Sequence, residues 1–225
     1  MVLSRRQFTQ KLGIITLAGI GSSVGLMHWI SSDFERVHFM AKDLRQNQYL
    51  IIYEEQTKGF SKFLTPVVRP HSVIFSPLAK SKMVILPRFH KYAEMINIES
   101  RETKSIRSYK NYYFYGHGRF SRDGKYLFTA ETSKSMTGFI IIRDAVSYRV
   151  IDKFPSYGFV PHDFHFIEQG RTLIIANNGI IAEKGISYDF ESSLTYVDVQ
   201  SYRLLEKEMI DDYPGLNIQH LSAEE

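Results

Sequence analysis

The sequence contains no cysteine among its 225 residues. This excludes disulfide bonds, thiolate zinc sites, thiol nucleophiles and lipid attachment at a cysteine. Any metal site must therefore use histidine, carboxylate or tyrosine side chains. Tryptophan is also scarce, because the single residue, Trp29, lies close to the N-terminus. A tryptophan-derived quinone cofactor therefore has no place in the body of the protein.

Most of the chain also lacks an excess of positively or negatively charged residues. The formal net charge is +4, but residues 1–32 contain Arg5, Arg6 and Lys11 and no acidic residue. The remaining body is close to neutral, so the sequence does not favour nucleic-acid binding. The sequence also has no P-loop, no serine nucleophile elbow and no glycine-rich dinucleotide fingerprint.

The N-terminal segment has the pattern of an export signal. Paired arginines are followed by an uncharged, glycine-containing stretch over residues 12–30. The residues SRRQF resemble the twin-arginine motif, with Arg5, Arg6 and Phe8 as its signal residues. Residues 1–32 are therefore predicted to be a twin-arginine signal, read by the export machinery, which places the body in the periplasm. The alternative is an anchor in the inner membrane, since about 20 residues can span a bilayer.

After this segment, short apolar runs rich in β-branched and aromatic residues replace any helical periodicity. The sequence predicts an all-β body over residues 33–225. The predicted strands are Tyr49–Tyr53, Val73–Phe75, Met83–Leu86, Met95–Ile98, Tyr126–Ala130, Phe139–Ile142, Val150–Phe154, Leu173–Ala176 and Leu194–Val197.

A repeat of about 45 residues organises these strands. Its three copies begin with RPHSVIFSPLAKSKMVILPR, GHGRFSRDGKYLFTAE and PHDFHFIEQGRTLIIANNG. Their histidines are His71, His117 and His162, spaced by 46 and 45 residues. Four strands in such a repeat are typical of a β-propeller blade of the WD40 or YVTN type, so we predict a propeller of about three and a half blades.

A fourth histidine, His220, follows His162 after 58 residues. The extra length falls between Asn177 and Ser192, which predicts an enlarged loop on one face of the propeller, often the binding face. Because closed propellers have four to eight blades, we expect either the N-terminal portion of a longer protein or a truncated product with an open edge.

In this order, the motifs resemble a family of exported bacterial proteins of unknown function, DUF1513. The matching segments are SRRQF, GHGRFSRDGKYLFTAE, DAVSYRVIDKFPSYGFVPHDFHFI, GRTLIIANNGI, SSLTYVD and LNIQHL. The resemblance implies a propeller like the β-chain of quinoprotein amine dehydrogenases and a connection to periplasmic iron acquisition. The loop after Gly179 is shorter than in the family and lacks its His-Pro and later Arg, so a function of that loop is not expected here.

The repeated histidines have two interpretations. As structural residues, they would hydrogen-bond the turns of their own or neighbouring blades, which is what repetition favours. As ligands, they would point to one mouth of the channel and bind Fe, Cu or Zn through neutral imidazoles. Two or three neighbouring blades could share such a site, because opposite strands of a seven-bladed ring lie too far apart. The candidate ligands are His71, His117, His162, His220, Glu131 and Asp163.

No catalytic residues are predicted. Glu131 and Asp144 could form an acid/base pair, but the sequence favours a strand end and a turn for them. We therefore expect a non-catalytic periplasmic propeller that binds a protein or a small ligand, in a metal uptake system such as that for iron. The alternatives are a metal- or quinone-associated oxidoreductase subunit and a truncated, non-functional copy. The sequence names no cofactor, and membrane contact is expected only through the N-terminal segment.

Overall fold

A computed structural model describes residues 36–183, 186–189, 191–209 and 218–222 of the chain. The predicted signal in residues 1–32, with Arg5, Arg6 and Phe8 and the alternative anchor over residues 12–30, lies outside these residues. Every described regular element is a strand, apart from one short 3-10 helix, Glu168–Gly170. Within this part of the chain, no helix is long and apolar enough to cross a membrane. The prediction of an all-β body is confirmed.

The chain divides into two compact units, residues 1–66 and 67–225. The described part of the first unit is an antiparallel sheet of β1 (Arg36–Lys42), β2 (Gln48–Glu54) and β3 (Gly59–Thr65). In the central strand β2, Leu50 and Ile52 are buried, as the period of two residues in a half-covered sheet requires. The turn from β1 to β2 is closed by Asp43, whose carboxylate accepts hydrogen bonds from the backbone N–H groups of Arg45 and Asn47.

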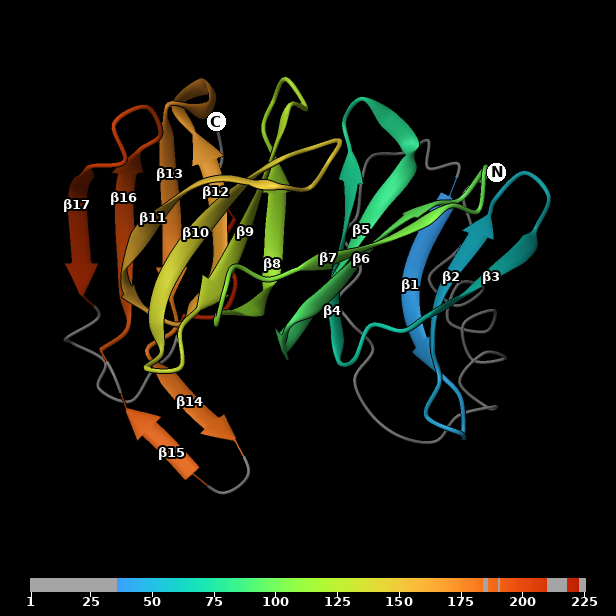
Figure 1. The fold of residues 1–225 in the computed structure, drawn as a ribbon, viewed down its shortest axis with the longest axis horizontal. Coiled ribbons are helices and arrows are strands. Elements are labelled where there is room, and N and C mark those ends of the chain that lie inside the picture. Colours follow the sequence, from blue (N-terminus) through green and yellow to red (C-terminus); the bar gives the residue numbers. More distant parts are fainter. Residues whose placement is uncertain (1–35, 184–185, 190, 210–217, 223–225) are drawn as a thin grey trace, which may run out of the picture. The chain divides into compact units, whose positions relative to one another are not determined.

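In its described residues, the second unit contains three blades of four antiparallel strands, and pairing of β5 with β8 joins the first two blades into one sheet (Figure 1). The first blade consists of β4 (Pro70–Ser76), β5 (Ala79–His90), β6 (Tyr92–Asn97) and β7 (Thr103–Arg107). The second consists of β8 (Tyr113–Phe120), β9 (Tyr126–Thr132), β10 (Thr137–Asp144) and β11 (Val150–Phe159). The third consists of β12 (Pro161–Ile167), β13 (Thr172–Asn177), β16 (Ser193–Asp198) and β17 (Leu204–Met209). The predicted blades of an incomplete β-propeller are confirmed.

Apolar side chains between the blades form the core of this unit. One cluster joins the first and second blades and includes Leu86, Met95, Phe114 and Leu127. A second cluster joins the second and third blades and includes Phe128, Ile140, Phe164 and Leu173. The end of β5 also pairs directly with β8, through Arg88 opposite Tyr115 and His90 opposite Phe114. Burial of these faces against one another stabilises neighbouring blades and fixes the positions of their first strands.

Eight of the nine predicted strands fall within observed strands, and the ninth, Met95–Ile98, runs one residue past the end of β6. The predicted enlarged loop of the third blade contains a small hairpin of β14 (Ile180–Glu183) and β15 (Ile186–Asp189), between β13 and β16. Strands β8 and β12 extend through the Gly-His-Gly and Pro-His segments, where histidine, glycine and proline interrupt the apolar pattern.

Aspartates at the ends of two third strands hold similar turns. Asp144 accepts hydrogen bonds from the backbone N–H and the hydroxyl of Ser147, at 2.6 and 2.7 Å. Asp198 makes the same two contacts with Ser201, at 2.7 and 2.6 Å. The following tyrosines, Tyr148 and Tyr202, have positive φ values of 61° and 59°. In both blades, an aspartate that accepts hydrogen bonds from the turn therefore accompanies a tyrosine of positive φ.

A buried ion pair joins β9 and β10 of the second blade. Glu131 is fully buried and contacts the guanidinium of Arg143, which is 1% exposed. The Glu131 carboxylate also accepts hydrogen bonds from the backbone N–H of Tyr109, at 2.7 Å, and from the hydroxyl of Thr129, at 3.0 Å. Burial raises the pKa of Glu131, and the Arg143 charge opposes that shift. The contacts of this carboxylate hold the second blade together.

We expect Glu131→Ala to lower the free energy of unfolding by about 3–5 kcal/mol, because it leaves the charge of Arg143 buried without its carboxylate. Urea denaturation followed by circular dichroism would measure the loss. The control is Lys125→Ala, which removes an exposed pair with Asp123 and should cost less than about 1 kcal/mol. Equal losses for the two variants would contradict this role of the buried pair.

Candidate functional site

The first strands of the three blades bring their histidines to one place. His71 is the second residue of β4, His162 is the second residue of β12, and His117 lies within β8. Strand β8 lies beside both β4 and β12. A fourth histidine, His220, comes from the segment 218–222. One ring nitrogen from each side chain, His71, His117, His162 and His220, lies within 4.8 Å of the other three. We call these four residues the histidine cluster.

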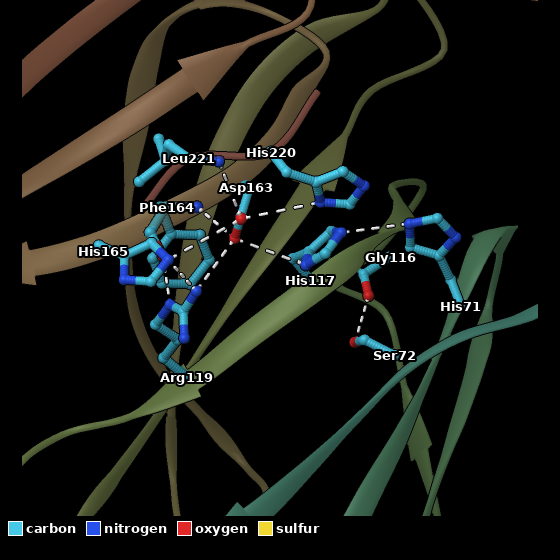
Figure 2. Close-up of polar contacts among 10 residues, drawn as sticks. All are labelled: His71, Ser72, Gly116, His117, Arg119, Asp163, Phe164, His165, His220 and Leu221. Carbon is cyan, nitrogen blue, oxygen red and sulfur yellow. Dashed lines mark hydrogen bonds and ion pairs between the residues drawn. The ribbon is translucent and has the colours of Figure 1, made fainter. Parts of the chain in front are cut away.

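The rings of the cluster contact one another directly. The Nε2 atoms of His71 and His117 are 3.1 Å apart, so one imidazole donates a hydrogen bond to the other (Figure 2). The ring centroid of His162 lies 5.3 Å from that of His71, 5.1 Å from that of His117 and 5.0 Å from that of His220. These spacings leave the facing nitrogens close enough to share one small bound group.

Glycine at position 116 allows the close approach of His71. A Cβ atom at Gly116 would overlap the imidazole ring of His71, and the glycine has a φ of +108°. Only glycine adopts this conformation without strain. The carbonyl oxygen of Gly116 also accepts a hydrogen bond from the hydroxyl of Ser72, the residue after His71 (Figure 2). The Gly-His pair of one blade therefore positions the histidine of the preceding blade as well as its own.

Asp163 lies on the other side of His117 from His71 (Figure 2). Its carboxylate is 6% exposed and lies 3.5 Å from Nδ1 of His117 and 3.9 Å from Nδ1 of His220. A carboxylate beside Nδ1 favours the tautomer that carries its proton there, which leaves Nε2 with a free lone pair. Asp163 is therefore placed to orient two histidines toward the centre of the cluster.

Arg119 connects the second and third blades behind this carboxylate. It follows His117 by two residues on β8 and contacts Asp163 at 3.3 Å. It also contacts His165 and donates a hydrogen bond to the backbone oxygen of Phe164 (Figure 2). Sequence analysis did not identify Arg119, although its position two residues after His117 places both on the same face of β8.

His162 is the most enclosed residue of the cluster. It is 1% exposed, and neither ring nitrogen has a hydrogen-bond partner among the residues that the structure describes. A buried polar atom without a partner costs about 1–3 kcal/mol. In the neutral ring one nitrogen carries the proton, so the other is available to a cation that binds within the cluster.

The surroundings keep these imidazoles neutral. Burial lowers the pKa of His71 to about 4 and that of His162 to about 2, with the charge of Arg88 acting in the same direction. Burial and the neighbouring histidines also hold the pKa of His117 well below its usual value. Neutral imidazole is the form that coordinates a metal ion.

The predicted candidates divide into two groups. The structure brings all four repeated histidines together, three of them from the first strands of neighbouring blades and His220 from the segment 218–222. Asp163 lies beside them. Glu131 contacts Tyr109, Thr129 and Arg143 instead and is not one of the clustered ligands. The carboxylate of Asp144 accepts a hydrogen bond from the backbone N–H of Ser147 in the turn after β10. Within the cluster, a hydrogen bond joins His71 to His117, and the Asp163 carboxylate lies beside His117 and His220.

Comparisons with known proteins identify the fold and a family. A family model described as "Protein of unknown function (DUF1513)" matches residues 66–225. No curated protein sequence matches the chain.

Three solved structures are similar to the chain. Hydrazine synthase of Kuenenia stuttgartiensis has 15% identity and a TM-score of 0.62, with 80% of this chain and 47% of that chain covered. Dihydro-heme d1 dehydrogenase NirN, in complex with DHE, has 15% identity and a TM-score of 0.58, with coverages of 81% and 37%. The Dos1 propeller has 11% identity and a TM-score of 0.60, with coverages of 84% and 47%. The chain spans less than half of each structure, and the likeness concerns the fold alone.

The stability of the metal-free protein should depend on pH through this cluster. The unfolded chain takes up protons at its histidines near pH 6.5, whereas folded His71 does so only near pH 4. Stability that is present above pH 6.5 is therefore lost as the pH falls toward 4, by at most about 1.4 kcal/mol per pH unit for each histidine. Urea denaturation in EDTA at several pH values would measure the slope. His71→Gln should flatten it, and an unchanged slope in this variant would contradict the assignment.

Proposed function

We propose that this chain, which belongs to the family of proteins of unknown function DUF1513, is a metal-binding β-propeller protein with the histidine cluster as its centre. One observation carries the proposal, namely the four ring nitrogens within 4.8 Å of one another. Three of the histidines come from strands of separate blades, so local sequence alone does not bring them together.

The donor set indicates the class of metal. Four imidazole ligands suit Zn, Cu, Fe or Ni, whereas Mg and Ca prefer oxygen ligands. At a metal–nitrogen distance of about 2.0–2.1 Å, tetrahedral ligands lie about 3.3–3.4 Å apart. The Nε2 atoms of His71 and His117 are already 3.1 Å apart. The ring nitrogens of the cluster lie within 4.8 Å of one another, so the rings would have to move closer together to complete the coordination.

Two further features support a bound cation. The nitrogens of buried His162 have no hydrogen-bond partner among the described residues, and a metal would satisfy one of them. Asp163 would act as the outer carboxylate that orients metal-binding histidines and increases their basicity. The four histidines together also favour a working binding protein over a degraded copy.

The proposal includes a location and a role. Export by the twin-arginine machinery would place the cluster in the periplasm, where the chain would bind metal and present it to a periplasmic partner. Iron is among the metals that suit the ligand set, in keeping with a part in iron or other metal uptake.

We expect the full-length protein to bind one Zn²⁺, Co²⁺ or Cu²⁺ ion per chain. Titration of EDTA-treated protein, followed by elemental analysis after gel filtration, would give the stoichiometry. His162→Ala should abolish tight binding, and Gly116→Ala should weaken it because the added methyl group displaces His71. His90→Ala is the matched control, since His90 lies in β5 outside the cluster. A folded wild-type protein that retains neither Fe²⁺ nor any of these three ions would overturn the proposal.

Export is tested separately. Changing Arg5 and Arg6 to lysine preserves the charge but removes the twin-arginine pair, so we expect the protein to accumulate in the cytoplasm. Lys11→Arg, the control, should leave export intact. Cell fractionation and immunoblotting would measure the distribution. Undiminished export of the double variant would contradict the twin-arginine route.

A further inference from the structure

His220 differs from the other members of the histidine cluster in its position and exposure. His71, His117 and His162 lie on strands that are part of four-stranded blades. His220 lies in the segment 218–222, which is in neither a helix nor a strand. Its side chain is 48% exposed, compared with 16% for His117, and His162 as a whole residue is 1% exposed. The cluster therefore has one side that is accessible to solvent.

The described backbone around His220 is also not part of a sheet, unlike the backbone of the other three histidines. The Nδ1 atom of His220 lies 3.9 Å from Asp163, and the next residue, Leu221, donates a backbone hydrogen bond of 3.4 Å to the same carboxylate (Figure 2). By comparison, β8 and β12 pair with β9 and β13 on both sides of their histidines, with a register shift at each histidine, and they carry buried side chains such as Phe114 and Phe164. Among the described residues, moving the ring of His220 would disturb its contact with Asp163 and its ring contacts with the other three histidines.

We propose that His220 is the exchangeable ligand of this centre, and that an external anionic ligand binds the metal at the position His220 vacates. This inference rests on the proposed metal-binding function. The three strand histidines would retain the ion, as three protein ligands do in zinc sites that leave one position open. Metal entry and release would use the same exposed side.

The surrounding charges determine the class of external ligand. The carboxylate that contacts the cluster, Asp163, is already paired with Arg119. The guanidinium of Arg88 donates a hydrogen bond of 3.2 Å to the hydroxyl of Tyr115, whose ring centroid lies 5.7 Å from that of His162. A divalent ion in these surroundings would leave an excess of positive charge in a partly desolvated place. A small anion, such as a carboxylate, would reduce that excess.

The test uses full-length protein loaded with Co²⁺, whose visible spectrum reports its coordination, and azide as the anionic probe. In the wild type, azide should change the spectrum.

His220→Ala should keep its cobalt, bind azide at least about tenfold more tightly and release cobalt to EDTA faster. Its affinity for Co²⁺ should fall by more than the roughly 10- to 100-fold that follows when a residue that only hydrogen-bonds a metal ligand is removed. Imidazole added to His220→Gly should restore the wild-type spectrum, and His90→Ala should behave as the wild type.

The outcomes separate this inference from the proposed function. A wild-type protein that takes up no metal would refute the metal centre itself. A cobalt-loaded wild type with a His220→Ala variant of unchanged spectrum and unchanged azide affinity would refute only the role of His220. Complete loss of cobalt in His220→Ala, equal to that in His162→Ala, would likewise show four equivalent ligands and no exchangeable position.

Discussion

The close packing of neutral imidazoles is the constraint on which the site depends. Four rings that were charged at this spacing would repel one another strongly, and burial would add a desolvation penalty. The structure avoids this cost by lowering the pKa values of His71, His117 and His162. Desolvation is the largest cause in each case, and it results from the packing of the blades. The fold thus keeps the histidines in the form that binds cations.

The blade repeat supplies the geometry that this arrangement needs. Each copy of the repeat places a histidine on its first strand, and the apolar clusters between blades align those strands. Gly116 then gives the His71 ring its space, and Arg119 ties β8 to the residues after His162. Positions that look like separate motifs in the sequence serve one shared site.

The sequence predicted the fold well and the site in part. The spacing of His71, His117 and His162 was enough to predict blades and equivalent histidine positions, because strand periodicity and repeat length are local properties. The sequence suggested convergence of the histidines only as one of two interpretations and could not decide between them, since convergence depends on the angle between neighbouring blades and on the position of the segment 218–222. Glu131 shows the same limit, because its partner Arg143 lies on the next strand and becomes apparent only when β9 pairs with β10.

The origin of the ligands in separate segments has a consequence for folding. Each blade contributes only one histidine to the cluster, so the centre does not exist until β4, β8 and β12 have docked. A cation bound there would join segments that are about 45 residues apart, much as a covalent cross-link does, and would restrict the separation of blades that otherwise meet mainly through side-chain packing. Docking of the blades and binding of the cation would then be coupled, because the cation would bind tightly only when the blades are correctly arranged.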